Sequence, residues 1–337
     1  MGSGAWDSGV YDRATRTRRA TGTKDFDYDD KVKSGRASGI HPDLDPKKVA
    51  GPTSPLAGEC VRESRDNDEH PESLPIAMFF DVTGSMGGIP RVLQKKLANL
   101  MDVVIAKAKI KDPQVLVGAI GDAYSDDYPL QVGQFESDNR FDEQLRNIIL
   151  EGNGGGQVME SYALAYRFAA YHTATDAFEK RGKKGYFFTM GDEAPWPTVS
   201  TEEVERIFGV RAKRDESIED LIAKARERWD IYHLFSMDGS YPDRTDIHNK
   251  WRELLGQYFV KVEDSSLVCE VIAGLIHMSE TAYDIDRVID DIGVKGAART
   301  AVKNALVPVA KSNIPTHVAT GGLPKSHGKG KGSMSRI

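Results

Sequence analysis

Short apolar runs alternate with amphipathic stretches about six times between residues 74 and 280, and this alternation constrains the fold more than any other feature. Several runs are apolar throughout and stop at a polar residue or a glycine, as expected of strands buried on both faces of a sheet. The intervening stretches carry apolar residues at spacings of three and four, which predicts amphipathic helices. The runs are 76–80, 115–120, 131–135, 185–190, 231–237 and 258–262, and the main helical stretches are 89–108, 141–150, 159–169, 247–255 and 267–276.

This order predicts an α/β fold: a doubly wound, mostly parallel central sheet with helices on both faces. Sites in such sheets lie at the carboxyl ends of the strands, where the strand order reverses. Three predicted strands end at an aspartate, namely Asp81, Asp122 and Asp192. We therefore expect the functional residues at these strand ends.

The flanks of this predicted domain, residues 73–280, differ from it in composition. Residues 1–72 are poor in aliphatic side chains and show no helical stripe, which predicts an irregular N-terminal arm. Its scattered aromatic residues favour an arm that lies on the domain. Residues 281–310 predict a small C-terminal helical extension, and 311–337 a flexible basic tail with five Lys and Arg and no acid. The aromatic residues of the arm are Trp6, Tyr11, Phe26 and Tyr28.

The overall charge and hydropathy exclude several classes of protein. A formal net charge of −6 argues against a dedicated nucleic-acid binder, and no apolar stretch is long enough to span a membrane. The first residues lack the apolar core of a signal peptide. The two cysteines, Cys60 and Cys269, form no zinc-binding or CxxC spacing and are expected to be unpaired thiols. We expect a cytoplasmic protein.

The segment after the first predicted strand, Asp81-Val82-Thr83-Gly84-Ser85, places one carboxylate and two hydroxyls at alternate positions. A tight turn at this point can direct the three oxygens to one place. Hard cations such as Mg²⁺ prefer oxygen ligands and usually keep some water. Since two of the three groups are neutral, a bound ion would retain positive charge and attract a further carboxylate from outside.

This motif resembles the DxSxS sequence of the metal-ion-dependent adhesion site in von Willebrand factor A domains, in the DxTGSM form of bacterial members, and the resemblance covers about residues 74–280. It implies Mg²⁺, Mn²⁺ or Ca²⁺ at Asp81, Thr83 and Ser85, with Asp192 as a further ligand. The family also uses a threonine in a loop that corresponds to 154–157, where this chain has none. Glu160 is the preferred substitute in this loop, and Gln157 the weaker one.

Other features favour ordinary structural roles. An isolated Asp-x-Thr-x-Ser segment is usually a hydrogen-bonded turn, and the acids Asp122, Asp126 and Asp127 are expected to be solvated loop residues, with a role near the metal as the alternative. His233 lies within an apolar run and is expected to be a satisfied core residue. Neither a GxSxG elbow nor a phosphate-binding GK[ST] ending occurs.

The resemblance implies a non-catalytic module, of bacterial or phage type, that binds an acidic residue of a partner protein through its metal. Similar domains serve as adaptors for MoxR-type AAA+ ATPases, so a protein of that class is the partner it suggests. Two alternatives stay open. The arm and the tail suit an assembly subunit that oligomerises, and Asp81-Val-Thr83-Gly-Ser85 also resembles the nucleophile motif of haloacid-dehalogenase phosphotransferases, with Asp81 as nucleophile.

Overall fold

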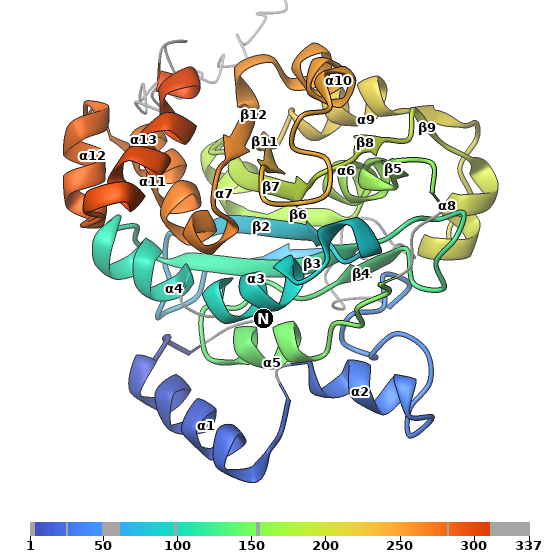
Figure 1. The fold of residues 1–337 in the computed structure, drawn as a ribbon, viewed down its shortest axis with the longest axis horizontal. Helices are drawn as coiled ribbons and strands as arrows, with labels where there is room; N and C mark the ends of the chain where they lie inside the picture. Colours follow the sequence, from blue (N-terminus) through green and yellow to red (C-terminus); the bar gives the residue numbers. More distant parts are fainter. Residues whose placement is uncertain are drawn as a thin grey trace, which may run out of the picture.

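A six-stranded sheet forms the centre of the protein in the computed structural model, which describes residues 4–24, 26–48, 61–97, 100–152, 156–281 and 283–310 (Figure 1). The strand order is β12-β11-β7-β2-β3-β4. All neighbours are parallel except β4, which pairs antiparallel with β3. The strands of this sheet are β2 (Leu74–Asp81), β3 (Pro113–Ile120), β4 (Leu130–Val132), β7 (Gly185–Gly191), β11 (Trp229–Ser236) and β12 (Phe259–Val262).

Helices cover both faces of the sheet, so the predicted doubly wound α/β fold is confirmed (Figure 1). Alternate residues of β2 enter two separate cores: Met78 and Phe80 pack with α3, α11 and α5, while Ala77 and Phe79 pack with α6, α9 and α10. The helices of the domain are α3 (Ile89–Leu97), α4 (Leu100–Asp102), α5 (Arg140–Arg146), α6 (Tyr162–Tyr171), α7 (Asp176–Arg181), α8 (Thr201–Phe208), α9 (Ile218–Ala225), α10 (Thr245–Leu255) and α11 (Val268–Glu280).

Short strands and helical turns complete the domain. Three small two-stranded sheets pair β1 (Arg62–Ser64) with β6 (Thr173–Thr175), β5 (Met159–Glu160) with β8 (Ala194–Pro195), and β9 (Thr198–Val199) with β10 (Glu216–Ser217). Helix α8 begins with a capping box, in which Ser200 and Glu203 satisfy each other's backbone N–H groups. The helical turns are η1 (Gly84–Met86), η3 (Gly256–Tyr258) and η4 (Ser265–Leu267).

The predicted helix over 89–108 differs from the structure in its second half. Helix α3 is followed, beyond residues 98–99, by α4 and then by a π-helical segment, η2 (Val103–Lys107). Periodicity cannot separate a π turn from an α-helix over so few residues, because both place apolar side chains on one face.

The N-terminal arm is not irregular throughout, which corrects the prediction. It contains two helices, α1 (Ser8–Thr21) and α2 (Asp27–Lys33), which lie on the side of the molecule that carries α5 (Figure 1). Helix α1 has no buried residue, so its sequence lacks the apolar stripe that would predict a helix. Its ends are instead defined by the Asp7 side chain, which caps the first turn, and by Gly22 in the left-handed conformation at the other end.

The aromatic anchors of the arm hold it to the domain, as their presence suggested. Phe26 is fully buried, and Trp6 and Tyr11 pack against the same core. The Trp6 Nε1–H also donates to Asp102, and Arg18 forms an ion pair with Asp142 of α5. The described part of the arm therefore packs on its own domain.

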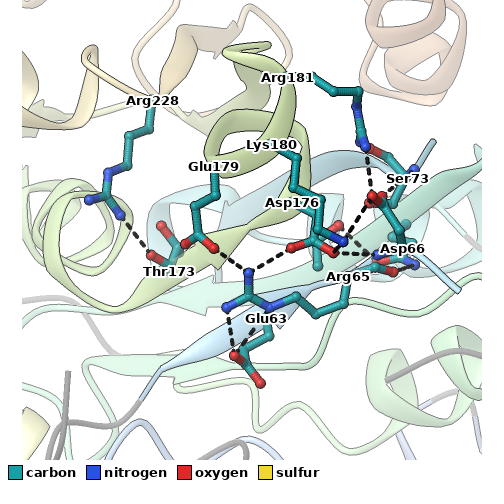
Figure 2. A network of polar contacts seen from close by, with 12 residues as sticks. Glu63, Arg65, Asp66, Ser73, Thr173, Asp176, Glu179, Lys180, Arg181 and Arg228 are labelled. Carbon is teal, nitrogen blue, oxygen red and sulfur yellow. Dashed lines mark hydrogen bonds and ion pairs between the residues drawn. The ribbon is translucent and has the colours of Figure 1, made fainter. Parts of the chain in front are cut away.

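A network of ion pairs fixes the chain between β1 and β2 to α7 (Figure 2). The Arg65 guanidinium contacts the carboxylates of Glu63, Asp176 and Glu179. Beside it, Asp66 accepts from Arg181 at 2.7 Å and from the Ser73 hydroxyl at 2.8 Å. Because β1 also pairs with β6, this segment belongs to the folded domain although its sequence shows no strand pattern.

The Asp66 pKa predicts how stability depends on pH in this region. Burial alone would raise that pKa, but hydrogen bonds from Arg181 and Ser73 outweigh it and lower the pKa to about 2. A lowered carboxyl pKa stabilises the fold above the unfolded value near 4, and the contribution is lost as the pH falls towards about 2. In urea unfolding, the stability difference between wild type and Asp66→Asn should be full at neutral pH and shrink across this window. A pH-independent difference would contradict the assignment.

The C-terminal extension is helical, as predicted: α12 (Ile285–Ile292) and α13 (Gly296–Ala310) pack on α11. The predicted basic tail, 311–337, lies outside the described residues, as does Cys60. Cys269 is a buried free thiol. Within the described ranges, no helix has both the length and the apolar character needed to cross a membrane.

Candidate metal site

Asp81 and Asp192 meet where the strand order reverses. The first sheet connection runs from β2 to β3 on one side, and the chain later returns to place β7 on the other side of β2. Residue 80 of β2 lies opposite residue 190 of β7, so both strands present their terminal carboxylates at the same edge. Both side chains are fully buried. The sequence prediction that these strand ends come together agrees with this geometry.

A chain of hydrogen bonds joins the three motif residues, Asp81, Thr83 and Ser85, to Asp192. Thr83 donates to Asp81 Oδ1 through both its backbone N–H, at 2.8 Å, and its hydroxyl, at 2.6 Å. Its hydroxyl lies 3.3 Å from the Ser85 Oγ, which donates to Asp192 Oδ1 at 2.9 Å. The three oxygen side chains of the motif therefore face one place, and Asp192 lies beside them.

Two further contacts fix the carboxylates from behind. The Tyr162 hydroxyl donates to Asp81 Oδ2 at 2.9 Å, and the Ser240 N–H donates to Asp192 Oδ2 at 2.6 Å. Gly191 allows the first contact, because a Cβ there would lie 1.8 Å from the Tyr162 hydroxyl and 3.0 Å from Asp81. The glycine at the end of β7 is thus required for close packing at the site.

Glu160 reaches the site from strand β5, and not from the helix that was expected to include residue 159. Helix α6 begins only at residue 162, because 159–160 pair with β8. Glu160 is 1% exposed, and its Oε2 has no hydrogen-bond partner. The weaker candidate, Gln157, is exposed. Of the two nominated loop residues, the structure buries Glu160 and leaves Gln157 at the surface.

The carboxylates at this edge repel one another. Burial, opposed by the Thr83 hydrogen bonds and reinforced by the negative charge of Asp192, raises the pKa of Asp81 to about 7. Burial and the neighbouring Asp192 likewise raise the pKa of Glu193 to about 7. The pKa of Glu160 is raised further, by burial and then by Asp81 and Glu193. A divalent cation bound among these groups would offset the cost of burying their charges and would reduce their mutual repulsion.

The donor set fits a hard cation. It consists of hydroxyl and carboxylate oxygens, and the unpartnered Oε2 of Glu160 is a buried acceptor without a donor. Within the described ranges, no three His, Cys, Asp or Glu side chains are grouped closely enough to hold a metal by themselves. An ion here would therefore depend on the hydroxyls of Thr83 and Ser85 and on water, as the sequence motif suggested.

The acids after β3 are not all solvated, which corrects another expectation. Asp122 and Asp126 are 2% and 6% exposed, and only Asp127 is exposed. Asp126 Oδ2 accepts from the Asp122 N–H, and Asp122 accepts from the Ser125 hydroxyl and from Trp196 Nε1 at 2.9 Å. These bonds show that Asp122 and Asp126 organise the loop beside the site.

His233 is only partly satisfied, contrary to the prediction. Its Nδ1 lies 2.9 Å from the Thr189 hydroxyl, but Nε2 has no partner in a fully buried position. The ring stacks on Trp251, with 3.6 Å between centroids. Burial lowers the pKa of His233 well below its usual value, so the ring is neutral.

Sequence reasoning missed three contributors to the site: Tyr162, Glu193 and Ser240. Tyr162 lies on the apolar stripe of its helix, a position that predicts a core residue and gives no role to its hydroxyl. Glu193 directly follows Asp192 and could have been nominated as part of the same strand end. Ser240 acts through its backbone, which no residue pattern reveals.

Tyr162 is expected to support metal binding without touching the ion. Tyr162→Phe removes the donor to Asp81 and should weaken Mn²⁺ binding about tenfold, the scale of loss for groups that orient a ligand. Tyr166→Phe is the matched control, because its hydroxyl is buried on the same helix but contacts Thr189. Calorimetric titration of both variants checks this, and equal losses would show that the effect is not specific to Asp81.

Fold and site together define a doubly wound α/β protein with a hydroxyl–carboxylate cluster at the carboxyl ends of its two central strands. No protein-family model matches the sequence, and a search of the curated proteins gives no match either.

Several solved structures are similar to this chain at a low level. Proximal thread matrix protein 1 from the mussel byssus is 9% identical over 61% of this chain, with a TM-score of 0.39, and the match covers 48% of that protein. The pilus adhesin SpaC from Lactobacillus rhamnosus GG is 8% identical over 68% of this chain, with a TM-score of 0.43, and the match covers 31% of the adhesin. The mussel protein with a zinc-occupied MIDAS motif is 10% identical over 61% of this chain, with a TM-score of 0.39 and 47% of its own length covered. The chain thus spans less than half the length of each.

Proposed function

We propose that this protein is a non-catalytic binding module that holds a divalent cation, Mg²⁺ in the first place, at Asp81, Thr83 and Ser85, and binds an Asp or Glu of a partner protein through that ion. The observation that carries the proposal is the convergence of these oxygens with Asp192 at the reversal of the strand order. Two hydroxyls do not neutralise the ion, so an external carboxylate gains a charge-assisted contact.

The surface beside the site supplies a second contact for a partner. Tyr124 is 62% exposed and packs on Trp196, with 4.5 Å between ring centroids. The indole N–H of Trp196 donates to Asp122, and its backbone N–H donates to the Glu160 carbonyl. Exposed aromatic residues held in fixed positions often dominate binding energy at interfaces. We propose that the partner segment carries an apolar residue near its acid; the resemblance suggests a MoxR-type AAA+ ATPase as the partner class.

The phosphotransferase alternative is less compatible with the motif around Asp81. The residue two positions after Asp81 is a threonine, where that chemistry would place an acid. The assembly alternative loses part of its basis, because the described arm packs on its own domain.

Peptide selection tests the proposed function directly. Peptides selected by display on the protein in Mg²⁺ and eluted with EDTA should contain an Asp or Glu, and a Glu→Gln change in a selected peptide should abolish binding. If binding persists in EDTA, or if glutamine replaces the acid without loss, the metal is not the contact.

Thr83→Asp separates metal binding from partner binding. The substitution keeps an oxygen ligand but adds a negative charge, so Mn²⁺ should bind at least as well while the acidic peptide binds more weakly. The phosphotransferase alternative predicts instead that Thr83→Asp gains phosphatase activity, since the new acid would protonate the leaving group. Measuring both properties in the same preparation distinguishes the two functions.

A further inference from the structure

A cavity of about 290 Å³ lies beside the edge strand β12, remote in the sequence from the metal motif. Its lining includes Arg252 from α10, Phe259 and Lys261 from β12, and Asn304 from α13. It therefore lies where three elements meet at the outer end of the sheet. One of its lining residues, Lys261, contacts a second nitrogen base, His248, which lies behind the lining.

Lys261 is partly buried and hydrogen-bonded to a histidine. Its Nζ lies 3.0 Å from the Nδ1 of His248, which is 3% exposed. The imidazole is enclosed by aromatic rings: Phe235 lies edge-on at 4.6 Å and Phe259 at 5.8 Å between centroids. The other ring nitrogen, Nε2, has no hydrogen-bond partner. The pair is thus set in a largely apolar position.

Carboxylates do not neutralise this pair directly. Among the described residues, neither Lys261 nor Arg252 forms an ion pair, and the Arg252 guanidinium lies over the Phe259 ring at 5.6 Å. Burial and the charge of Arg252 lower the pKa of Lys261, against a weaker opposite effect of Asp243. Burial, then Lys261 and Arg252, lower the pKa of His248, with Asp243 and Asp246 opposing. Glu263 also lines the cavity, and its carboxylate accepts a hydrogen bond from Asn304 of α13.

We propose that Lys261 is a reactive amine whose cavity takes a small anionic aldehyde, with Arg252 binding the anion. A partly buried lysine beside another cation, here Arg252, has features that activate amines for attack on carbonyl groups. Nζ forms a bond to the carbonyl carbon and passes a proton to His248 Nδ1. The carbonyl oxygen leaves as water after taking up two protons, one from Nζ and the other returned by His248 Nδ1, and an imine remains.

Trapping with glyoxylate tests this proposal on the full-length protein. Glyoxylate and cyanoborohydride at neutral pH should reduce the imine to a stable adduct that mass spectrometry of the digested protein locates. Lys261 should be labelled faster than Lys250, which lies on α10 and is paired with Glu219, because burial and the charge of Arg252 lower the pKa of Lys261 and so increase its fraction of free amine. Equal labelling of the two lysines would overturn the proposal.

A matched pair of reagents tests the role of Arg252. Arg252→Gln should slow labelling of Lys261 by glyoxylate several-fold more than labelling by propanal, which carries no charge. Lys250 serves as the internal standard in both reactions. If both aldehydes slow equally, Arg252 does not bind the anion and the assigned ligand class is wrong.

Discussion

Asp81→Asn is expected to abolish the response of this protein to divalent cations. In thermal unfolding, wild type should gain stability with Mg²⁺ or Mn²⁺, whereas the variant should unfold at the same temperature in metal and in EDTA. Asp81 is the one carboxylate of the motif, and loss of a direct ligand should weaken binding about 100-fold or more, beyond the loss expected for orienting groups. At a metal concentration 100 times the wild-type Kd, wild type gains about 2.7 kcal/mol, whereas a variant that binds 100-fold more weakly gains only about 0.4 kcal/mol.

The same variant should behave differently without metal. Asp81 is fully buried, and Asp192 and Glu193 add to the electrostatic penalty on its charge. Asparagine keeps the size and the acceptor oxygen but removes the charge, so in EDTA the variant should be at least as stable as wild type. A reversal of the stability order between EDTA and Mg²⁺ is therefore the signature of a metal site.

Asp127→Asn is the control, since it removes an exposed acid from the loop after β3. It should leave both the metal response and the stability in EDTA unchanged. The metal assignment fails if Asp81→Asn and wild type bind Mn²⁺ equally in calorimetry. If instead the variant is strongly destabilised in EDTA, Asp81 is a structural hydrogen-bond acceptor for Thr83 and Tyr162.

The fold could be predicted because its strands are buried on both faces. Residues 76–80 and 185–190 read as continuous apolar runs, and their terminal acids mark the edge where they meet. Two parts of the motif were equally visible, since Thr83 and Ser85 alternate with Asp81 in a segment too polar for the core.

What could not be predicted depends on contacts with little local signature. Helix α1 has no buried residue and is held by end caps, an ion pair and the partly buried Tyr11. Strand β1 is three residues long, and its partner lies more than 100 residues away in sequence. Glu160 was nominated, but its position on a two-residue strand follows from pairing with β8, which periodicity cannot detect. The β5–β8 pairing fixes how the loops that carry Glu160 and follow Asp192 meet at the site.

We expect Arg65→Met to lower the free energy of unfolding more than the replacement of any other partly exposed cation in the described ion pairs. Arg65 contacts three carboxylates at once, and two of them, Glu63 and Asp176, have side chains only 1% and 8% exposed (Figure 2). Methionine fills similar volume but leaves Glu63 without its cation and Asp176 with Lys180 alone, and breaking a fully buried pair costs about 3 to 5 kcal/mol. Because the Arg65 side chain is 20% exposed, solvent screening reduces the expected loss to about 2 to 4 kcal/mol.

The comparison with Arg211→Met isolates the effect of burial. Arg211 pairs with Glu205, but the two side chains are 88% and 60% exposed, so its replacement should change stability by less than about 1 kcal/mol. Urea unfolding of both variants at neutral pH measures the difference. Because the network is one of the contacts that hold β1, beside its pairing with β6 and the hydrogen bonds of Arg62 and Ser64, Arg65→Met should also speed amide exchange in residues 62–64 before the sheet itself opens. Similar losses in the two variants would show that the Arg65 network is as weak as an ordinary surface ion pair and that the other contacts of β1 hold this segment.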